Sequence, residues 1–246
     1  MANWVFKGLS TGIVTTKYPA RADEKLGSFW VTPVVAGGKC VPECNRCVEA
    51  CYAGAIAKDA RALTIDYAKC QFCSRCVEAC PAGVIAYGLA RIGTGNILKT
   101  TADRTKSLFR HSLHIRHVDA GACEACLSEI GMLATPYYDI SRLGFFFTSS
   151  PRHADALMVS GPVTANMEEA VLKTYQAMPD PKLVIAVGAC AGMSCPAKAD
   201  YACRKRLDSL IPVDLYIAGC PASPLQIIHG LLTLVGREPK PAQKSV

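Results

Sequence analysis

Four closely spaced cysteines constrain this chain more than any other feature of its sequence. They begin at Cys70 and read Cys-Gln-Phe-Cys-Ser-Arg-Cys-Val-Glu-Ala-Cys-Pro, which follows the spacing CxxCxxCxxxCP. In bacterial ferredoxins this run holds cubane iron–sulfur clusters, with three thiolates on one cluster and the fourth on the other. The spacing therefore predicts [4Fe–4S] binding, and electron transfer becomes the first functional hypothesis.

A similar run begins about 30 residues earlier, at Cys40. It has one extra residue between its first two cysteines, and Tyr52 follows its last cysteine where proline is usual. An internal repeat of this kind is typical of a two-cluster ferredoxin, and the crossed ligation rule then predicts two four-cysteine sites. We define site 1 as Cys40, Cys44, Cys47 and Cys80, and site 2 as Cys51, Cys70, Cys73 and Cys76.

Two other uses of paired cysteines are weaker alternatives. Tetrahedral zinc sites also use CxxC pairs, but zinc modules rarely pack four cysteines into about eleven residues twice over. A disulfide framework suits small secreted chains, whereas this one has 246 residues and does not begin with a secretory apolar region. The cysteines are therefore predicted to bind metal in a reducing compartment.

The formal net charge of +7 would ordinarily suggest binding to nucleic acid. Coordinating thiolates are deprotonated, however. Clusters at sites 1 and 2, together with a third cluster for which four further cysteines are considered below, would involve twelve thiolates and lower the net charge to about +1. We therefore predict no nucleic-acid partner. No run reaches the roughly 18 apolar residues that a membrane-spanning helix needs, so the chain is expected to be soluble or peripherally attached.

The residues after the cysteine repeat predict a different architecture. Short, continuous apolar runs alternate there with helical stretches, which indicates a parallel sheet buried on both faces. The expected strands are 113–118, 145–148, 156–160, 183–187 and 213–218. A helix with Thr164 as its N-cap is expected between the third and fourth strands.

Four further cysteines follow these strands. Cys123 and Cys126 come after the first strand, Cys190 after the fourth and Cys220 after the fifth. Open α/β sheets bind ligands beyond the carboxyl ends of their strands. These four residues, which we define as site 3, are therefore predicted to hold a third [4Fe–4S] cluster.

These features give a two-domain expectation within the α/β class. An N-terminal two-cluster ferredoxin-like α+β domain with an N-terminal extension is expected over residues 1–95, followed by a connector at 96–112. A flavodoxin-like parallel-sheet domain is expected over 113–246. FMN in that domain is a weak alternative, because the loop after its first strand carries Cys123 and Cys126 rather than a phosphate-binding sequence.

Several segments carry a family resemblance. The sequence resembles the small subunit of membrane-bound, energy-converting [NiFe] hydrogenases, with formate hydrogenlyase as the closest type, and the homologous complex I subunit that carries the terminal cluster. The N-terminal stretch 7–19 is similar to the two-cluster ferredoxin subunit of the same complexes, so the chain looks like a fusion of two subunits. The segments that carry the resemblance to the small subunit are 116–130, 134–139, 150–157, 188–190 and 213–221.

The resemblance implies a function and a set of partners. The chain would carry electrons without catalysing a reaction itself, and it would hold no nickel, flavin or nucleotide. Its partners would be a hydrogenase-like large subunit, other hydrophilic and membrane subunits, and a donor such as formate dehydrogenase, carbon monoxide dehydrogenase or ferredoxin. Its location would be cytoplasmic, on the inner face of the cell membrane. The CxxC of Cys123 and Cys126 favours the hydrogenase branch over complex I, where these cysteines are adjacent.

Other residues have less specific interpretations. The resemblance places Glu129 near the third cluster, where hydrogenases pass protons, although a glutamate early in a helix is also favoured by the helix dipole. Hydrogenase relatives usually carry a glycine pair where Ser194 and Cys195 stand. This departure keeps open a complex I-like relay that reduces quinone or another acceptor. Cys195 and Cys203 are expected to be buried packing residues.

Local predictions concern the loops and the histidines. Asp119 is expected to hydrogen-bond the loop that carries Cys123. Gly121 and Gly188 are expected to let the backbone approach the cluster closely. His111, His114 and His117 are interpreted as structural or surface residues rather than as metal ligands.

Overall fold

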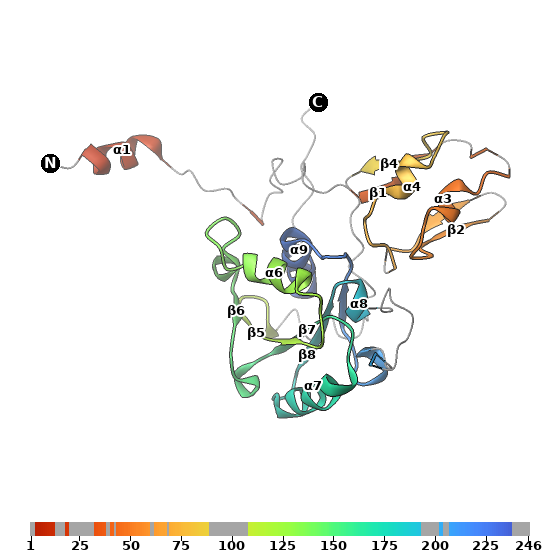
Figure 1. The fold of residues 1–246 in the computed structure, drawn as a ribbon. Helices are drawn as coiled ribbons and strands as arrows, with labels where there is room; N and C mark the ends of the chain where they lie inside the picture. Colours follow the sequence, from red (N-terminus) through yellow and green to blue (C-terminus); the bar gives the residue numbers. More distant parts are fainter. Residues whose placement is uncertain are drawn as a thin grey trace.

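The computed structural model describes residues 3–12, 18–19, 32–37, 40–41, 43–59, 62–67, 69–88, 108–192, 202–203 and 207–237. Cys195 and residues 96–107 of the expected connector lie outside these ranges. Figure 1 shows two parts. The cysteine-bearing part, within residues 32–88, is built from short strands and carries sites 1 and 2, and the larger part, within residues 108–237, is built on a five-stranded sheet.

The cysteine-bearing part consists of two similar halves. Strand β1 (Thr32–Val35) pairs antiparallel with β4 (Ile85–Gly88), and β2 (Ile56–Lys58) pairs antiparallel with β3 (Leu63–Ile65). The short helices are α3 (Arg46–Glu49) and α4 (Arg75–Glu78), one in each half. The core of this part consists of Cys47, Ile56, Cys76 and Ile85. Cysteines thus form half of a small core, so whatever they bind would also hold this part together.

The larger part is built on a parallel sheet whose strands are ordered β6-β5-β7-β8-β9. Counted along the chain, this order is 2-1-3-4-5, and every neighbouring pair is parallel. All five predicted strands are present, and β7 and β8 are buried along their whole length. The strands are β5 (Leu113–Asp119), β6 (Phe145–Phe147), β7 (Ala156–Ser160), β8 (Leu183–Val187) and β9 (Leu215–Ile217).

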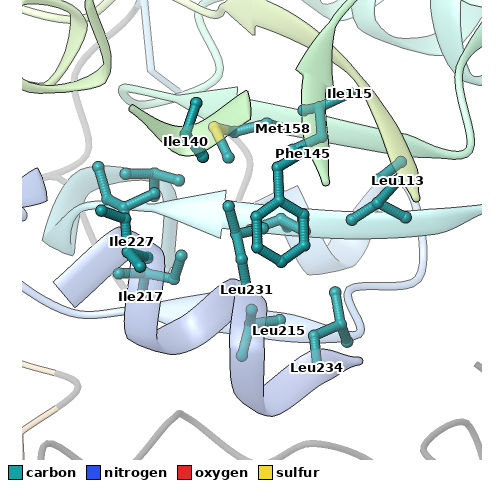
Figure 2. Close-up of a cluster of buried hydrophobic side chains, with 14 of the residues drawn as sticks. Leu113, Ile115, Ile140, Phe145, Met158, Leu215, Ile217, Ile227, Leu231 and Leu234 are labelled. Carbon is teal, nitrogen blue, oxygen red and sulfur yellow. The ribbon is translucent and has the colours of Figure 1, made fainter. Parts of the chain in front are cut away.

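Helices cover both faces of the sheet. On one face, α6 (Ala125–Met132) and α9 (Pro224–Leu234) pack over an apolar cluster, and Figure 2 shows Phe145 and Leu231 filling the space between the sheet and α9. On the other face lie α7 (Ala165–Ala177), α8 (Ala189–Gly192) and the 3-10 helix η3 (Leu207–Ser209). The remaining 3-10 helices are η1 (Ile140–Leu143) and η2 (Pro151–His153).

The start of α9 is fixed by a reciprocal pair of hydrogen bonds. Gln226 N donates to Ser223 Oγ at 3.4 Å, and Ser223 N donates to Gln226 Oε1 at 2.6 Å. This capping box, with Pro224 in the first turn, satisfies backbone donors that a helix leaves unpaired. It anchors the loop after β9, which carries Cys220.

Helix α7 starts after Thr164 as predicted, but the side chain of this residue has another partner. Thr164 is the N-cap residue, but its side chain makes no capping hydrogen bond. Its hydroxyl instead donates to the carbonyl oxygen of Ala120 at 3.2 Å. Thr164 therefore ties α7 to the loop after β5.

Two N-terminal segments are described. Helix α1 (Asn3–Thr11) exposes Trp4, Phe6 and Leu9. Tyr18 lies against the apolar cluster beneath α9, so the N-terminal extension contacts the core of the larger part. Within the described residues, no helix is long and apolar enough to cross a membrane.

Candidate iron–sulfur sites

The cysteines of sites 1 and 2 line two separate cavities. The first is lined by all four cysteines of site 1, together with Val41, Leu63 and the residues 81, 82 and 84. The second is lined by all four cysteines of site 2, together with Tyr52, Gln71 and Arg75 among others. The free space, including that at the mouths, is about 300 Å³ and about 360 Å³. Cavities of similar size, each with four thiols, are suited to the same kind of group.

Each of the two cysteine runs, around α3 and around α4, contributes to both cavities. Cys47 faces the first cavity and Cys51, four residues later, faces the second. Around α4, Cys76 faces the second cavity and Cys80, four residues later, faces the first. Four helical residues advance about 6 Å, so the two cavities lie close together.

Backbone N–H groups point at the sulfurs of both sites. Ala55 N donates to Cys51 Sγ at 3.3 Å, and Phe72 N donates to Cys70 Sγ at 3.5 Å. Burial disfavours the Cys80 thiolate, but the N–H groups of residues 82–85 outweigh it and lower the pKa of Cys80. Such N–H groups stabilise negative charge on sulfur, which a bound cluster requires.

Non-glycine residues with left-handed backbone occur in each cysteine loop. Their φ angles are 63° at Glu43, 55° at Phe72, 63° at Ser74 and 67° at Glu124. This conformation is uncommon outside glycine and concentrates at functional sites. Alternating right- and left-handed residues also turn successive N–H groups toward one concavity, which favours an anionic group.

Burial shifts the pKa of several of these thiols upward. It raises the pKa of Cys76 to about 11, and the charge of Cys70 adds to this effect. Burial also raises the pKa of Cys70 and that of Cys47. A metal binds the thiolate form, so these thiols would release their protons when a cluster binds.

Site 3 lies at the carboxyl edge of the parallel sheet. Burial raises the pKa of Cys126, the Ala222 N–H lowers it, and the charges of Cys220, Cys123 and Glu129 raise it further. Cys123, Cys126 and Cys220 are therefore electrostatic neighbours, and Cys190 is the second residue of α8, directly after β8. The Cys123 loop follows β5 next to β7, where the strand order reverses, which is the usual ligand position in such sheets.

The predicted hydrogen bonding of Asp119 to the loop is confirmed, and Gly188 lies against the Cys126 sulfur, while its approach to a cluster stays a prediction. A β-carbon on residue 188, whose φ is +88°, would lie 2.7 Å from Cys126 Sγ. Asp119 Oδ1 accepts hydrogen bonds from Gly121 N at 2.9 Å and from Ala122 N at 2.7 Å. Gly121 differs from the expectation, because a β-carbon there would meet Thr164 Cγ2 at 2.5 Å. Its small size serves the contact with the start of α7.

Tyr52 lines the cavity of site 2, and the charge of Cys220 in site 3 also acts on it. Its hydroxyl donates to Gln71 Oε1, and the guanidinium carbon of Arg75 lies 5.6 Å from the centre of its ring. Partial desolvation raises the pKa of Tyr52, the charges of Cys73 and Cys220 raise it further, and Arg75 lowers it. A single side chain is thus a neighbour of one cysteine from each site.

The sequence predicted structural roles for the histidines and a packing role for Cys203. His114 Nδ1 lies 3.4 Å from Asp155 Oδ2, and its ring stacks on Phe146. His117 Nε2 hydrogen-bonds Ser160 Oγ at 2.9 Å. Both contacts agree with a structural interpretation. Cys203 is half-buried, and its role as a packing residue stays a prediction.

Sequence reasoning missed three contacts around these sites. These are the hydroxyl of Tyr52 beside Gln71, the Ala222 N–H beside Cys126, and the ammonium of Lys58 on two carbonyls near site 1. The departure of Tyr52 from the usual proline was the available signal for the first. The other two depend on tertiary contacts that a single sequence does not display.

The donor set fits iron–sulfur clusters. Among the described residues, no three His, Cys, Asp or Glu side chains converge in the way that a single metal ion requires. The thiols instead surround cavities, with N–H groups directed at their sulfurs. A cubane binds one thiolate at each of its iron atoms, so its four ligands stand around it in this way.

Comparisons with known proteins agree with this arrangement. The family described as NADH ubiquinone oxidoreductase, 20 Kd subunit, matches residues 123–234, and the 4Fe-4S dicluster domain family matches residues 39–84. The probable membrane-bound hydrogenase subunit mbhJ of Pyrococcus furiosus is 45% identical over 117 residues, which are 47% of this chain and 70% of that protein.

Two solved structures are also similar. One is described as the membrane-bound sulfane sulfur reductase, an archaeal respiratory membrane complex. It is 34% identical, the match covers 53% of this chain and 72% of that one, and the TM-score is 0.48. The other, an NAD+-reducing [NiFe]-hydrogenase in the H2-reduced state, is 22% identical over 52% of this chain and 94% of that one, with a TM-score of 0.40.

The cysteine cavities and the dicluster match define the class of protein as an iron–sulfur electron-transfer subunit. The match over residues 123–234 identifies the family within that class. The chain belongs to the NADH ubiquinone oxidoreductase 20 Kd subunit family, which includes hydrogenase subunits, and it carries a 4Fe-4S dicluster domain ahead of the family region.

Proposed function

We propose that this chain relays electrons through three [4Fe–4S] clusters, held at sites 1, 2 and 3, in an energy-converting [NiFe] hydrogenase complex of formate hydrogenlyase type. When bound, a [4Fe–4S] cluster accepts and releases single electrons. The observation that carries the proposal is the grouping of site 1 and site 2 thiols around two cavities. The site 3 cysteines follow strands β5, β8 and β9 of one parallel sheet, which adds support.

The order of the relay follows from the neighbours of each site. Sites 1 and 2 share α3 and α4, so they exchange electrons directly. Tyr52 and Cys73 form the side of site 2 that faces Cys220 of site 3. Cys73 and Cys220 are both exposed, and exposed ligands are where electrons leave a buried centre. In this proposal the electrons pass from the dicluster domain to the sheet edge.

The domain division supports this order. We propose a dicluster domain with its extension over residues 1–95, a connector at 96–112, and a flavodoxin-like domain over 113–246 that holds the third cluster. The strand order 2-1-3-4-5 supports the flavodoxin-like assignment. The contact of Tyr18 with the core beneath α9 ties part of the N-terminal extension to the C-terminal domain.

The partner at site 3 would be a hydrogenase-like large subunit. The CxxC arrangement of Cys123 and Cys126 and the similarity to mbhJ support a hydrogenase partner. Glu129, a neighbour of Cys126, would pass protons between that partner and solvent. Other hydrophilic subunits and membrane subunits would hold the assembly on the inner face of the cell membrane, and formate dehydrogenase, carbon monoxide dehydrogenase or ferredoxin would exchange electrons with the dicluster domain.

A second candidate is a complex I-like relay without hydrogenase activity. Ser194 and Cys195 stand where hydrogenase relatives usually have two glycines near the large subunit. A large subunit without nickel ligands would then transfer the electrons to quinone or another acceptor.

The test is purification of the native complex under anaerobic conditions through a tag on this chain. Iron and nickel are measured, and hydrogen evolution is assayed with a low-potential dye. About twelve iron atoms per chain, together with nickel and hydrogen evolution, are expected. The same iron without nickel or hydrogen would favour the complex I-like relay, and iron-free protein would refute both candidates.

A further inference from the structure

The loop between Cys40 and Cys44 is one residue longer than the corresponding loop between Cys70 and Cys73. Its backbone makes a tight turn, in which Cys44 N donates to the Val41 carbonyl at 3.3 Å and Glu43 has a φ of 63°. A non-glycine residue in this conformation persists only where its surroundings hold it. The longer loop, like the regular loop with Phe72 and Ser74, therefore depends on contacts that hold its backbone.

Lys58 provides that support. It is the last residue of β2, and its ammonium donates to the Cys44 carbonyl at 2.7 Å and to the Val41 carbonyl at 3.3 Å. Val41 is bonded to Cys40, and Cys44 is itself a site 1 residue, so one cation joins both ends of the loop. Charged hydrogen bonds of this length are stronger than those between neutral groups.

The internal repeat offers a comparison within the same chain. Lys58 lies seven residues after Cys51, and Tyr87 lies seven residues after Cys80. The half with the longer loop thus has a lysine where the half with the regular loop has a tyrosine, which is 52% exposed. The lysine and the additional loop residue occur together.

We propose that Lys58 is a positioning residue of site 1. It holds the enlarged loop so that Cys40 and Cys44 stay at the cavity, and its positive charge favours the reduced state of a cluster bound there. A cation beside a centre that becomes more negative on reduction raises its reduction potential. This inference rests on the proposed function in one respect, namely that the cavity holds a cluster.

The experiment compares four variants of the full chain with the wild type, each purified anaerobically and then measured for iron and titrated with EPR detection. Lys58→Met removes the charge and the donor at similar length, and Lys58→Arg keeps both. Lys173→Met is the matched control, because Lys173 is 73% exposed on α7 and pairs with Glu169 there. A Cys44→Ser variant identifies the EPR signal of site 1.

Lys58→Met is expected to lose the site 1 signal and about four of about twelve iron atoms, or to retain the cluster at a lower reduction potential. Sites 2 and 3 should be unchanged, and Lys58→Arg should restore site 1. The inference is overturned if Lys58→Met has the same iron content and the same site 1 reduction potential as Lys173→Met. It is also overturned if Lys58→Met loses iron from all three sites to the same extent. A wild-type chain without iron would instead refute the proposed function.

Discussion

Gly188 and Cys126 are in contact across the edge of the parallel sheet. A β-carbon at position 188 would lie 2.7 Å from the Cys126 sulfur, and the residue has a φ of +88°. Gly188 N donates to the Ile217 carbonyl at 2.8 Å, and Ala189 N donates to the Gly219 carbonyl at 2.8 Å, so this backbone is joined to β9. The close approach is therefore held by two hydrogen bonds to the end of β9 and the residues that follow it.

Gly188→Ala is expected to eliminate the third cluster, because the methyl group requires a backbone that alanine rarely adopts and space that the sulfur occupies. Iron should fall from about twelve to about eight atoms per chain. Gly131→Ala is the control, because a β-carbon there meets nothing within 4 Å in α6. That variant should keep its iron and be more stable by at most about 1 kcal/mol. Full iron in Gly188→Ala would refute the packing argument.

The sequence predicted the sheet well because its inner strands β7 and β8 are buried on both faces. Strands β7 and β8 have the bounds expected from their continuous apolar runs, whereas β9 (Leu215–Ile217) is shorter than its apolar run. The two predicted cysteine groupings of the repeat each line one cavity, because chain connectivity around short helices determines which thiols meet. Ligation itself stays a prediction.

The contacts that the sequence did not reveal join distant segments. Tyr18 lies beneath α9, and Lys58 contacts Val41 and Cys44. Tyr18 lies in the stretch 7–19 and Lys58 in the internal repeat, but neither pattern reveals these contacts, which form only when strands and helices have packed. Thr164 is a further example of a contact that the sequence did not reveal. It occupies the predicted cap position, but its hydroxyl hydrogen-bonds the Ala120 carbonyl.

Tyr52 is expected to shield site 2. Its side chain lines the cavity and is 59% exposed, so Tyr52→Ala would admit water and oxygen to that cluster. The visible absorbance of the site 2 cluster should bleach faster in air in Tyr52→Ala, whereas Tyr52→Phe should resemble the wild type. Tyr87→Ala, an exposed strand residue in the other half, is the control. Equal bleaching in all variants would show that Tyr52 does not cover the site.

Tyr18 is expected to stabilise the larger part of the chain. Tyr18→Ala should lower the free energy of unfolding by about 1–3 kcal/mol, because it removes a partly buried aromatic ring from the core. Phe6→Ala is the control, since Phe6 is 71% exposed and should change stability by no more than about 0.5 kcal/mol. Denaturant unfolding measures both. A small effect at Tyr18 would mean that the extension does not pack on the core in solution.

The ionisation of Tyr18 gives an independent test of the same contact. Burial raises the pKa of Tyr18 to about 12, although Arg142 lowers it. In an ultraviolet pH titration, wild type and Tyr18→Phe should therefore coincide near pH 10, the ordinary tyrosine range, and separate only toward pH 12. Separation near pH 10 would place Tyr18 in water.

His117 gives the larger part of the chain a dependence on pH. Burial lowers the pKa of His117 below its ordinary value of 6.5, Asp119 raises it, and Arg116 lowers it further. Its Nε2 lies 2.9 Å from Ser160 Oγ, and Ser160 is fully buried. The Nε atom of Arg116 is also buried, without a hydrogen-bond partner in the described part of the chain. A proton on His117 would thus add a second positive charge in a poorly solvated place.

The sign of the effect follows from proton binding. Between the lowered pKa of the folded protein and the ordinary value of 6.5, the unfolded chain binds more protons, so stability falls as pH drops through this range. His117→Gln cannot titrate, and its thermal midpoint should fall less than that of the wild type between about pH 7.5 and about pH 5.5. His153→Gln is the control, because His153 is exposed and should follow the wild-type profile. Parallel profiles for His117→Gln and the wild type would show that protonation of His117 does not oppose folding.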